Sequence, residues 1–288
     1  MGLINSIKII LEMIKFKHTI FALPFAYLGM VLGAGGVPPL LPFLWITLAM
    51  IGARSYAMAV NRLFDMDIDR KNPRTSGWPL PRGLISIRET IIFSLVSLVV
   101  FFVAVYMLTP LCRKFWPVVL LPMTFYSLTK RFTFLCHFFL GLCLGLAPLG
   151  AWIATTNTLP PSGIWALGFA VLCWTAGFDI IYSCQDYHFD KKESLHSIPA
   201  RFGIGTALTC SKILHALTIL SFLYLGSNFS LGPLFYIGVV IIALFLWYEN
   251  RIISPQDLSK INMSFFTVNG FVSIFAFIFT FLSIYFNL

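Results

Sequence analysis

Two short segments of this sequence hold most of its acidic side chains. In the first, NRLFDMDIDRKNPR at residues 61–74, Asn61, Asp65 and Asp69 follow one another at a spacing of i, i+4 and i+8. On a helix of about 3.6 residues per turn, side chains at this spacing lie on one face. Carboxylate and amide oxygens are ligands for a hard divalent cation such as Mg²⁺, so the segment predicts a metal site.

The second segment, DIIYSCQDYHFD at residues 179–190, repeats this arrangement. Its polar side chains are spaced i, i+3, i+7 and i+11, in the order Asp179, Tyr182, Asp186 and Asp190. The last three have the same spacing as the first segment, and all four are expected on one helical face. The repetition predicts a single domain over residues 1–288, with two related halves, about 1–130 and 131–288, whose acidic faces oppose each other.

Carboxylates that converge in this way repel one another unless something neutralises them. Mg²⁺ does so while also binding the oxygens of a substrate phosphate, and neighbouring bases then contact the anion. The candidate bases beside the two segments are Arg70, Lys71, Arg74, Lys130, Arg131, Lys191 and Lys192. The lysines at 191 and 192 are equally explained as solvated loop residues, and Asp67, which is out of step with its neighbours, is expected to face water.

The remainder of the chain is strongly apolar. Of its 288 residues, 58% are hydrophobic and 11% are charged, against about 25% charged in an ordinary soluble domain. Continuous apolar runs of about 18–25 residues recur along the whole length, each long enough to cross a bilayer. We therefore predict an all-α polytopic membrane protein. The net charge of +9 lies in short loops between these runs, which argues against a nucleic-acid partner.

The apolar runs predict nine transmembrane helices. Their expected ranges are 19–36, 39–62, 86–109, 115–130, 134–155, 163–185, 206–226, 231–248 and 263–286. With the N-terminus in the cytoplasm, Arg113 and Lys114 are the two bases on the opposite side, and Arg54 and Lys212 fall within spans. All other lysines and arginines are then cytoplasmic, as are both acidic segments, which agrees with the excess of positive charge in cytoplasmic loops.

Arg54 lies seven residues before Asn61 and is expected on the same helical face, deeper in the membrane. A charged side chain in a span is costly and usually functional, although a structural ion pair with an aspartate is an alternative. The six cysteines show no spacing typical of zinc ligands or of a disulfide framework. The five histidines likewise form no ligand pattern, so we expect them to be structural or loop residues.

These segments resemble the motifs of the UbiA superfamily of intramembrane prenyltransferases. NRLFDMDIDRKNPRT is similar to the family's first motif, NxxxDxxxD, and DIIYSCQDYHFD to its second, DxxxD, with an upstream DxxY. YSLTKR at residues 126–131 resembles the YPxxKR stretch of the 4-hydroxybenzoate polyprenyltransferase branch, with Ser127 in place of proline. KFKHTIFALPFA and LHSIPARFG also look like that branch, so the resemblance covers essentially the whole chain.

The resemblance implies nine transmembrane helices around a central cavity, with a cytoplasmic cap, in a bacterial inner membrane. It also implies that a polyprenyl diphosphate binds through Mg²⁺ and that its prenyl group is transferred to a ring carbon of an aromatic acid. The implied metal ligands are Asn61, Asp65, Asp69, Asp186 and Asp190. The bases implied at the diphosphate are Arg70, Lys71, Arg74, Lys130, Arg131 and Lys192. No obligatory protein partner is implied.

Two points stay open at the level of sequence. Arg54 or Arg131 is expected to bind the carboxylate of the acceptor, and Asp179 or Tyr182 to orient or deprotonate its hydroxyl group. The acceptor is expected to be 4-hydroxybenzoate, with a dihydroxynaphthoate of menaquinone synthesis as the alternative. A secondary transporter is a competing class, but its site would lie near the bilayer midplane and not at one face.

Overall fold

The computed structural model describes residues 3–15 and 19–286, and this part of the chain is helical without a β-strand. The long helices are α2 (Thr19–Ala34), α3 (Leu40–Lys71), α4 (Ile87–Met107), α5 (Pro110–Phe125), α6 (Cys136–Thr156), α7 (Ser162–Ser183), α10 (Ile204–Asn228), α11 (Pro233–Ile252) and α13 (Asn269–Phe286). The shorter helices are α1 (Leu3–Met13), α8 (Tyr187–Lys192), α9 (Ile198–Phe202) and α12 (Ile261–Met263). The predicted all-α class is confirmed.

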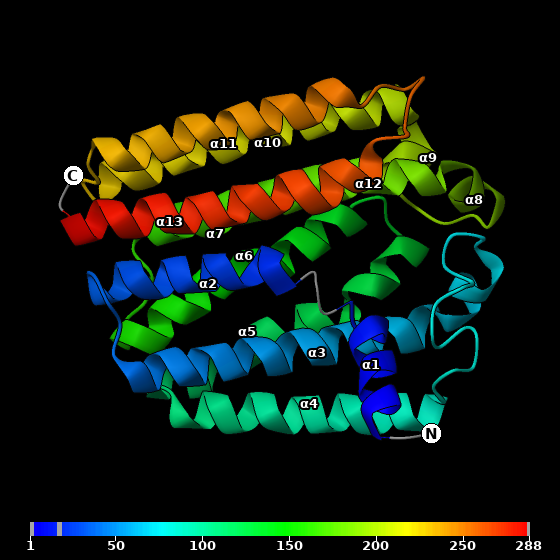
Figure 1. The fold of residues 1–288 in the computed structure, drawn as a ribbon, viewed down its shortest axis with the longest axis horizontal. Helices are drawn as coiled ribbons and strands as arrows, with labels where there is room; N and C mark the ends of the chain where they lie inside the picture. The colour runs from blue at the N-terminus through cyan, green and yellow to red at the C-terminus, as the bar shows by residue number, and fades with distance from the viewer. Residues whose placement is uncertain (1–2, 16–18, 287–288) are drawn as a thin grey trace.

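The long helices lie side by side with their axes roughly aligned, and α1 lies across one end of them (Figure 1). The same end of the bundle carries α8, α9 and the loop between α3 and α4, whereas the C-terminus lies at the other end. Both acidic segments therefore lie at one end of the bundle, as a site near one membrane face requires.

Seven helical stretches in the described part are long and apolar enough to cross a membrane, so the chain has the character of a multi-pass membrane protein. They are Leu40–Lys71, Ile87–Met107, Cys136–Thr156, Ser162–Lys192, Ile204–Asn228, Pro233–Ile252 and Ile261–Phe286. The other two predicted spans, 19–36 and 115–130, overlap α2 and α5, which have 16 residues each, and α5 begins and ends five residues earlier than predicted. A count of nine crossings therefore stays a prediction.

Helix α3 continues to Lys71, beyond the predicted end near residue 62, and carries all three aspartates of the first acidic segment. Pro73 explains the end of the helix, because a residue that precedes proline avoids the helical region, and Asn72 has an extended backbone with φ −82° and ψ 118°. The chain turns back at this point, so the residues that follow α3 lie over the second acidic segment.

Close contact between helices depends on glycine at two places. A Cβ atom on Gly52 of α3 would lie 2.7 Å from the backbone nitrogen of Phe101 in α4, and one on Gly145 of α6 would lie 2.5 Å from the carbonyl oxygen of Gly168 in α7. Small residues let membrane helices approach until their backbones touch. These contacts hold α3 against α4 and α6 against α7, and thus set the frame for the acidic segments.

The second acidic segment is not one continuous helix. Helix α7 ends at Ser183, a 3₁₀ turn covers Cys184–Asp186, and α8 begins at Tyr187. The predicted unbroken stripe is therefore interrupted, although its members still lie at one end of the bundle. The stretch Ser162–Lys192, which contains α7, is the most enclosed of the seven candidate spans in the described part of the chain, with 72% of its apolar run buried.

Candidate active site

A pocket of about 280 Å³ opens between α3, α6, α7 and the loop after α3, and we call it the charged pocket. Nine of the side chains predicted to be functional line it: Arg54, Asn61, Asp65, Asp69, Arg74, Lys130, Asp179, Tyr182 and Asp186. The two acidic segments, more than 100 residues apart in sequence, thus face a common space.

The first acidic segment has its closest hydrogen-bond donors within its own helix. Asn61 donates from Nδ2 to Oδ2 of Asp65 over 2.8 Å, one turn along α3. Arg62 donates from Nη1 to Oδ2 of Asp69 over 3.2 Å, two turns along, and both side chains of this pair are about nine-tenths buried. Arg62 was not among the predicted site residues. Its spacing of i, i+7 from Asp69 is the signal that would have identified it.

The second acidic segment is neutralised by residues distant in sequence. Arg74 donates from Nε and Nη2 to the two oxygens of Asp186 over 2.9 and 2.6 Å, and from Nη1 to the hydroxyl of Tyr182 over 3.1 Å. Asn72 adds a fourth hydrogen bond, from Nδ2 to Oδ1 of Asp186 over 2.9 Å. This bidentate pair exists because α3 ends at Asn72 and the chain reverses there.

Asp190 is fully buried and held from two sides. The Nζ atom of Lys130 lies 2.7 Å from its Oδ1, and the Ser197 hydroxyl donates to its Oδ2 over 2.9 Å. Ser197 also caps α9 by accepting from the backbone N–H of Ala200. The backbone N–H of His196 donates to the carbonyl of Lys130 over 2.8 Å, so the stretch LHSIPARFG braces the second acidic segment.

These pairs keep the bases charged. Burial alone would lower the pKa of Arg74, but its hydrogen bonds and charge interaction with Asp186 outweigh burial and raise that pKa above its ordinary value. Burial likewise opposes the charge of Lys130, and the adjacent Asp190 carboxylate raises the pKa of the ammonium group. The pocket therefore presents fixed positive charges that are already oriented.

His137 is a site residue that the sequence analysis assigned to structure or loop. It is 2% exposed on α6 and lines the charged pocket. Its Nδ1 lies 2.7 Å from Oδ2 of Asp179, and its Nε2 accepts the backbone N–H of Ile198 over 3.3 Å. A spacing of 42 residues from Asp179 gave no local pattern to detect.

Five of the seven candidate bases lie outside the lining of the charged pocket, namely Arg70, Lys71, Arg131, Lys191 and Lys192. Asp67 is exposed, as expected. Lys71 pairs with Glu193 over 2.9 Å at the surface, Arg70 approaches Asp67 over 3.9 Å, and Lys192 is exposed. Arg131 is largely exposed, 3.8 Å from Oδ1 of Asp65, and donates to the carbonyl of Phe64. A role for these bases at an anion remains a prediction.

Aromatic side chains complete the wall of the charged pocket. Trp78, in the loop after α3, makes cation–π contacts with two of the bases. Its ring centroid lies 4.1 Å from Cζ of Arg62 and 5.7 Å from Cζ of Arg74. Phe265 packs against Tyr182 with ring centroids 4.3 Å apart. Both line the pocket, and neither was singled out from the sequence, because the chain has 30 phenylalanines and 7 tryptophans.

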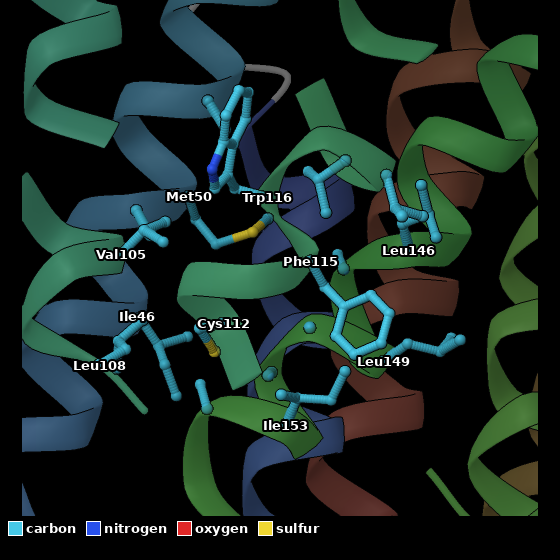
Figure 2. A pocket seen from close by; sticks show the side chains of 18 of the residues that line it. Ile46, Met50, Val105, Leu108, Cys112, Phe115, Trp116, Leu146, Leu149 and Ile153 are labelled. Carbon is cyan, nitrogen blue, oxygen red and sulfur yellow. The ribbon is translucent and has the colours of Figure 1, made fainter. Parts of the chain in front are cut away.

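A second pocket, of about 220 Å³, lies deeper between α3, α4, α5 and α6, and we call it the apolar pocket. Figure 2 shows Met50, Trp116, Phe115 and Leu149 converging on it, and none of its lining side chains is charged. Its lining on α3 reaches Ala53, directly before Arg54 of the charged pocket. The two pockets therefore follow one another along the same helices, from polar to apolar.

The oxygen ligands of the two segments suit Mg²⁺, but the described residues contain no group of three or more His, Cys, Asp or Glu side chains placed to hold one ion. Mg²⁺ commonly takes one or two carboxylates and completes its shell with water and substrate phosphate. Asp65, Asp69 and Asp186 line the charged pocket and meet that smaller requirement, whereas Asp190 is fully buried outside its lining. The donor set therefore fits ions that bind together with a phosphate ligand.

The fold and the site together define the class of protein. It is an all-helical membrane bundle with a pocket of paired acidic and basic side chains at one end. The model of the UbiA prenyltransferase family matches residues 22–283. Among the relatives of this chain is the 4-hydroxybenzoate octaprenyltransferase of Vibrio atlanticus. The two are 30% identical over 241 residues, which cover 84% of each chain. The protein of the same name from Francisella tularensis subsp. novicida is 28% identical over 217 residues, which cover 75% of this chain and 76% of that protein.

Solved structures agree with this relationship. The apo structure of a UbiA homolog from Aeropyrum pernix K1 has a TM-score of 0.82 and 32% sequence identity, and the match covers 90% of this chain and 95% of that one. A UbiA homolog from Archaeoglobus fulgidus bound to GPP and Mg²⁺ shares the fold, with a TM-score of 0.70 at 21% identity over 96% of this chain and 99% of that one. The chain belongs to the UbiA prenyltransferase family.

Proposed function

We propose that this protein transfers a polyprenyl group from a polyprenyl diphosphate to a ring carbon of an aromatic acid, with 4-hydroxybenzoate as the preferred acceptor. The observation that carries the proposal is the charged pocket, in which two acidic segments and four buried or half-buried bases converge and beside which an apolar pocket begins. The relatives named 4-hydroxybenzoate octaprenyltransferase support this choice of acceptor over a dihydroxynaphthoate.

The diphosphate would bind where the paired acids and bases meet. Asn61, Asp65, Asp69, Asp186 and Asp190 would hold Mg²⁺, which when bound neutralises the diphosphate and makes it a better leaving group. Arg74 and Lys130 are oriented by their carboxylate partners and lie at the pocket, so they are placed to contact the departing anion. Preoriented charges of this kind stabilise a leaving group without reorganisation.

The isoprenoid tail would occupy the apolar pocket. Its lining from α3, α4, α5 and α6 carries no charge, so a hydrocarbon chain loses nothing there by leaving lipid. The first prenyl carbon would then lie at the junction of the two pockets, near Arg54. Tyr182, Phe265 and Trp78 line the charged pocket with π faces, which favour an allylic cation as the carbon–oxygen bond breaks.

The acceptor carboxylate is proposed to lie near Arg54, a charged side chain that lines the pocket from within a span. Arg131 is the alternative, although its side chain is largely exposed. The membrane arrangement is proposed to be nine crossings in a bacterial inner membrane, built from two related halves. The N-terminus and a cap formed by α8, α9 and the loop after α3 would face the cytoplasm.

The test uses purified protein in detergent with Mg²⁺ and octaprenyl diphosphate. 4-Hydroxybenzoate and 1,4-dihydroxy-6-naphthoate are supplied in parallel, and products are identified by mass. Octaprenyl-4-hydroxybenzoate together with released diphosphate is the expected result, and removal of Mg²⁺ by EDTA should abolish it until Mg²⁺ is restored. Product from the naphthoate alone would contradict the preferred acceptor, and product from neither would contradict the proposed function.

A further inference from the structure

The pair formed by His137 and Asp179 lies on the wall of the charged pocket and takes no part in binding the diphosphate as proposed above. Asp179 lies on α7 about two helical turns before Asp186, on the side of the apolar pocket. Its carboxylate side chain is 24% exposed, whereas His137 behind it is 2% exposed. One oxygen of Asp179 is therefore held from within the protein while the residue faces the pocket.

The hydrogen bonds of His137 determine which of its nitrogens carries the proton. The backbone N–H of Ile198 donates to Nε2, so Nε2 acts as an acceptor and the ring proton of neutral histidine lies on Nδ1. Nδ1 then donates to Oδ2 of Asp179 over 2.7 Å. A carboxylate that accepts this bond is held in one rotamer, and its other oxygen, Oδ1, has no hydrogen bond within the described residues.

Tyr182, the other candidate for this role, has a different partner. Its hydroxyl oxygen accepts a hydrogen bond from Nη1 of Arg74, the same guanidinium that binds Asp186. This bond ties the phenol to the diphosphate end of the pocket, and its ring packs on Phe265. Of the two predicted groups, Asp179 is thus the one that lines the charged pocket without a bond to Arg74.

We propose that Asp179 accepts the proton that the aromatic acceptor loses and that His137 is the positioning residue that holds Asp179 for this step. The inference rests on the proposed prenyl transfer. The bond between the first prenyl carbon and the diphosphate oxygen breaks, and its electron pair leaves with the diphosphate. The ring carbon beside the acceptor hydroxyl forms the new carbon–carbon bond, its proton passes to Oδ1 of Asp179, and the ring regains its aromatic electrons.

The arrangement also explains why His137 lies where it does. Its two hydrogen bonds join α6, which carries it, to α7 through Asp179 and to the start of α9 through Ile198. The segment that begins α9 also holds Asp190 through Ser197. The proton-accepting group and the second acidic segment are therefore supported by one short stretch of backbone.

The test compares wild-type protein with His137→Leu, His137→Asn and Asp179→Asn. Leucine preserves bulk but donates no hydrogen bond, whereas the amide of asparagine can replace Nδ1 as donor to Asp179. We expect His137→Leu and Asp179→Asn to lower kcat about 100-fold, as loss of a general base does, with KM for the polyprenyl diphosphate changed less than about twofold. We expect His137→Asn to recover kcat to within about fivefold of wild type.

The outcomes separate this inference from the function on which it rests. An active wild type together with a His137→Leu variant of unchanged kcat would overturn the role of His137 and leave the prenyl transfer standing. Loss of kcat in His137→Asn equal to that in His137→Leu, or an equal rise in the donor KM, would show that the histidine only supports the fold. A wild type that forms no prenylated product with either acceptor would overturn both proposals.

Discussion

The two acidic segments have the same spacing in sequence but are built in different ways. The aspartates of the first lie on the uninterrupted helix α3, and their closest hydrogen-bond donors, Asn61 and Arg62, come from the same helix. The second is broken by a 3₁₀ turn, and its partners Arg74 and Lys130 come from other parts of the chain. One segment is organised by helical periodicity, and the other by tertiary contacts.

We therefore expect substitutions of Asp65 and Asp186, one in each segment, to differ in their effect on thermal stability, even where both abolish turnover. In the first segment, removal of Asp65 leaves the backbone hydrogen bonds of α3 intact and takes away only the side-chain acceptor of Asn61 and the distant partner of Arg131, whereas removal of Asp69 would leave the buried Arg62 without its carboxylate. In the second segment, removal of Asp186 leaves the donors of Arg74 and Asn72 without their acceptor in a partly buried site, because four hydrogen bonds meet at or near this carboxylate. Breaking one member of a buried pair costs more than the pair contributes when intact.

The largest effect is expected for Asp186→Ala and Asp65→Ala, each of which should reduce turnover at least about 1000-fold because a metal ligand and its charge are lost. Asp186→Ala should also lower the thermal unfolding midpoint, whereas Asp65→Ala should lower it little, since Asp65 is partly exposed. Product formation and thermal unfolding in detergent measure the two effects. Asp67→Ala, on the same helix and exposed, is the matched control.

Equal losses of thermal stability in the two variants would remove the distinction between the segments. Turnover that survives in Asp65→Ala would contradict its place in the metal site.

Arg74→Lys tests the tertiary contact directly. Lysine keeps the charge but cannot donate two parallel hydrogen bonds to Asp186 and a third to Tyr182, so kcat is expected to fall about 30-fold to 100-fold. Arg82→Lys, an exposed change in the same loop, should leave turnover unchanged. If Arg74→Lys behaves like Arg82→Lys, then charge alone is sufficient at this position.

Ala53→Phe tests whether the apolar pocket holds the tail. Ala53 is 4% exposed and lines this pocket, so a phenyl ring there removes space for a long chain. KM for octaprenyl diphosphate is expected to rise about tenfold, while that for geranyl diphosphate changes less than about twofold. Ile51→Phe, on the exposed side of α3, is the control. Equal changes for both donors would place the tail elsewhere.

The smallest effect is expected for Lys71→Ala. Lys71 is next to the first segment in sequence, but its partner is Glu193 at the surface and it does not line the charged pocket. Steady-state kinetics should show a change in kcat/KM below about twofold, because exposed ion pairs contribute little. A tenfold or larger loss would bring Lys71 back to the diphosphate site, where the sequence alone suggested it.

The sequence by itself determined the class of fold and the first acidic segment. Hydropathy and length predict membrane helices because a backbone in lipid must satisfy its own hydrogen bonds. A spacing of i, i+4 and i+8 places Asn61, Asp65 and Asp69 on one face because helical geometry is local, and the structure places all three at one pocket.

Only the tertiary structure decided which charges meet. Pro73 ends α3 and turns Arg74 back onto Asp186, the α9 segment brings Ser197 to Asp190, and packing of α6 on α7 brings His137 to Asp179. Each pair joins residues from different elements, and its distance depends on how those elements pack. Proximity in sequence therefore did not reveal that Lys71 pairs with Glu193 or that His137 pairs with Asp179, because electrostatic and hydrogen-bond partners depend on distance in space.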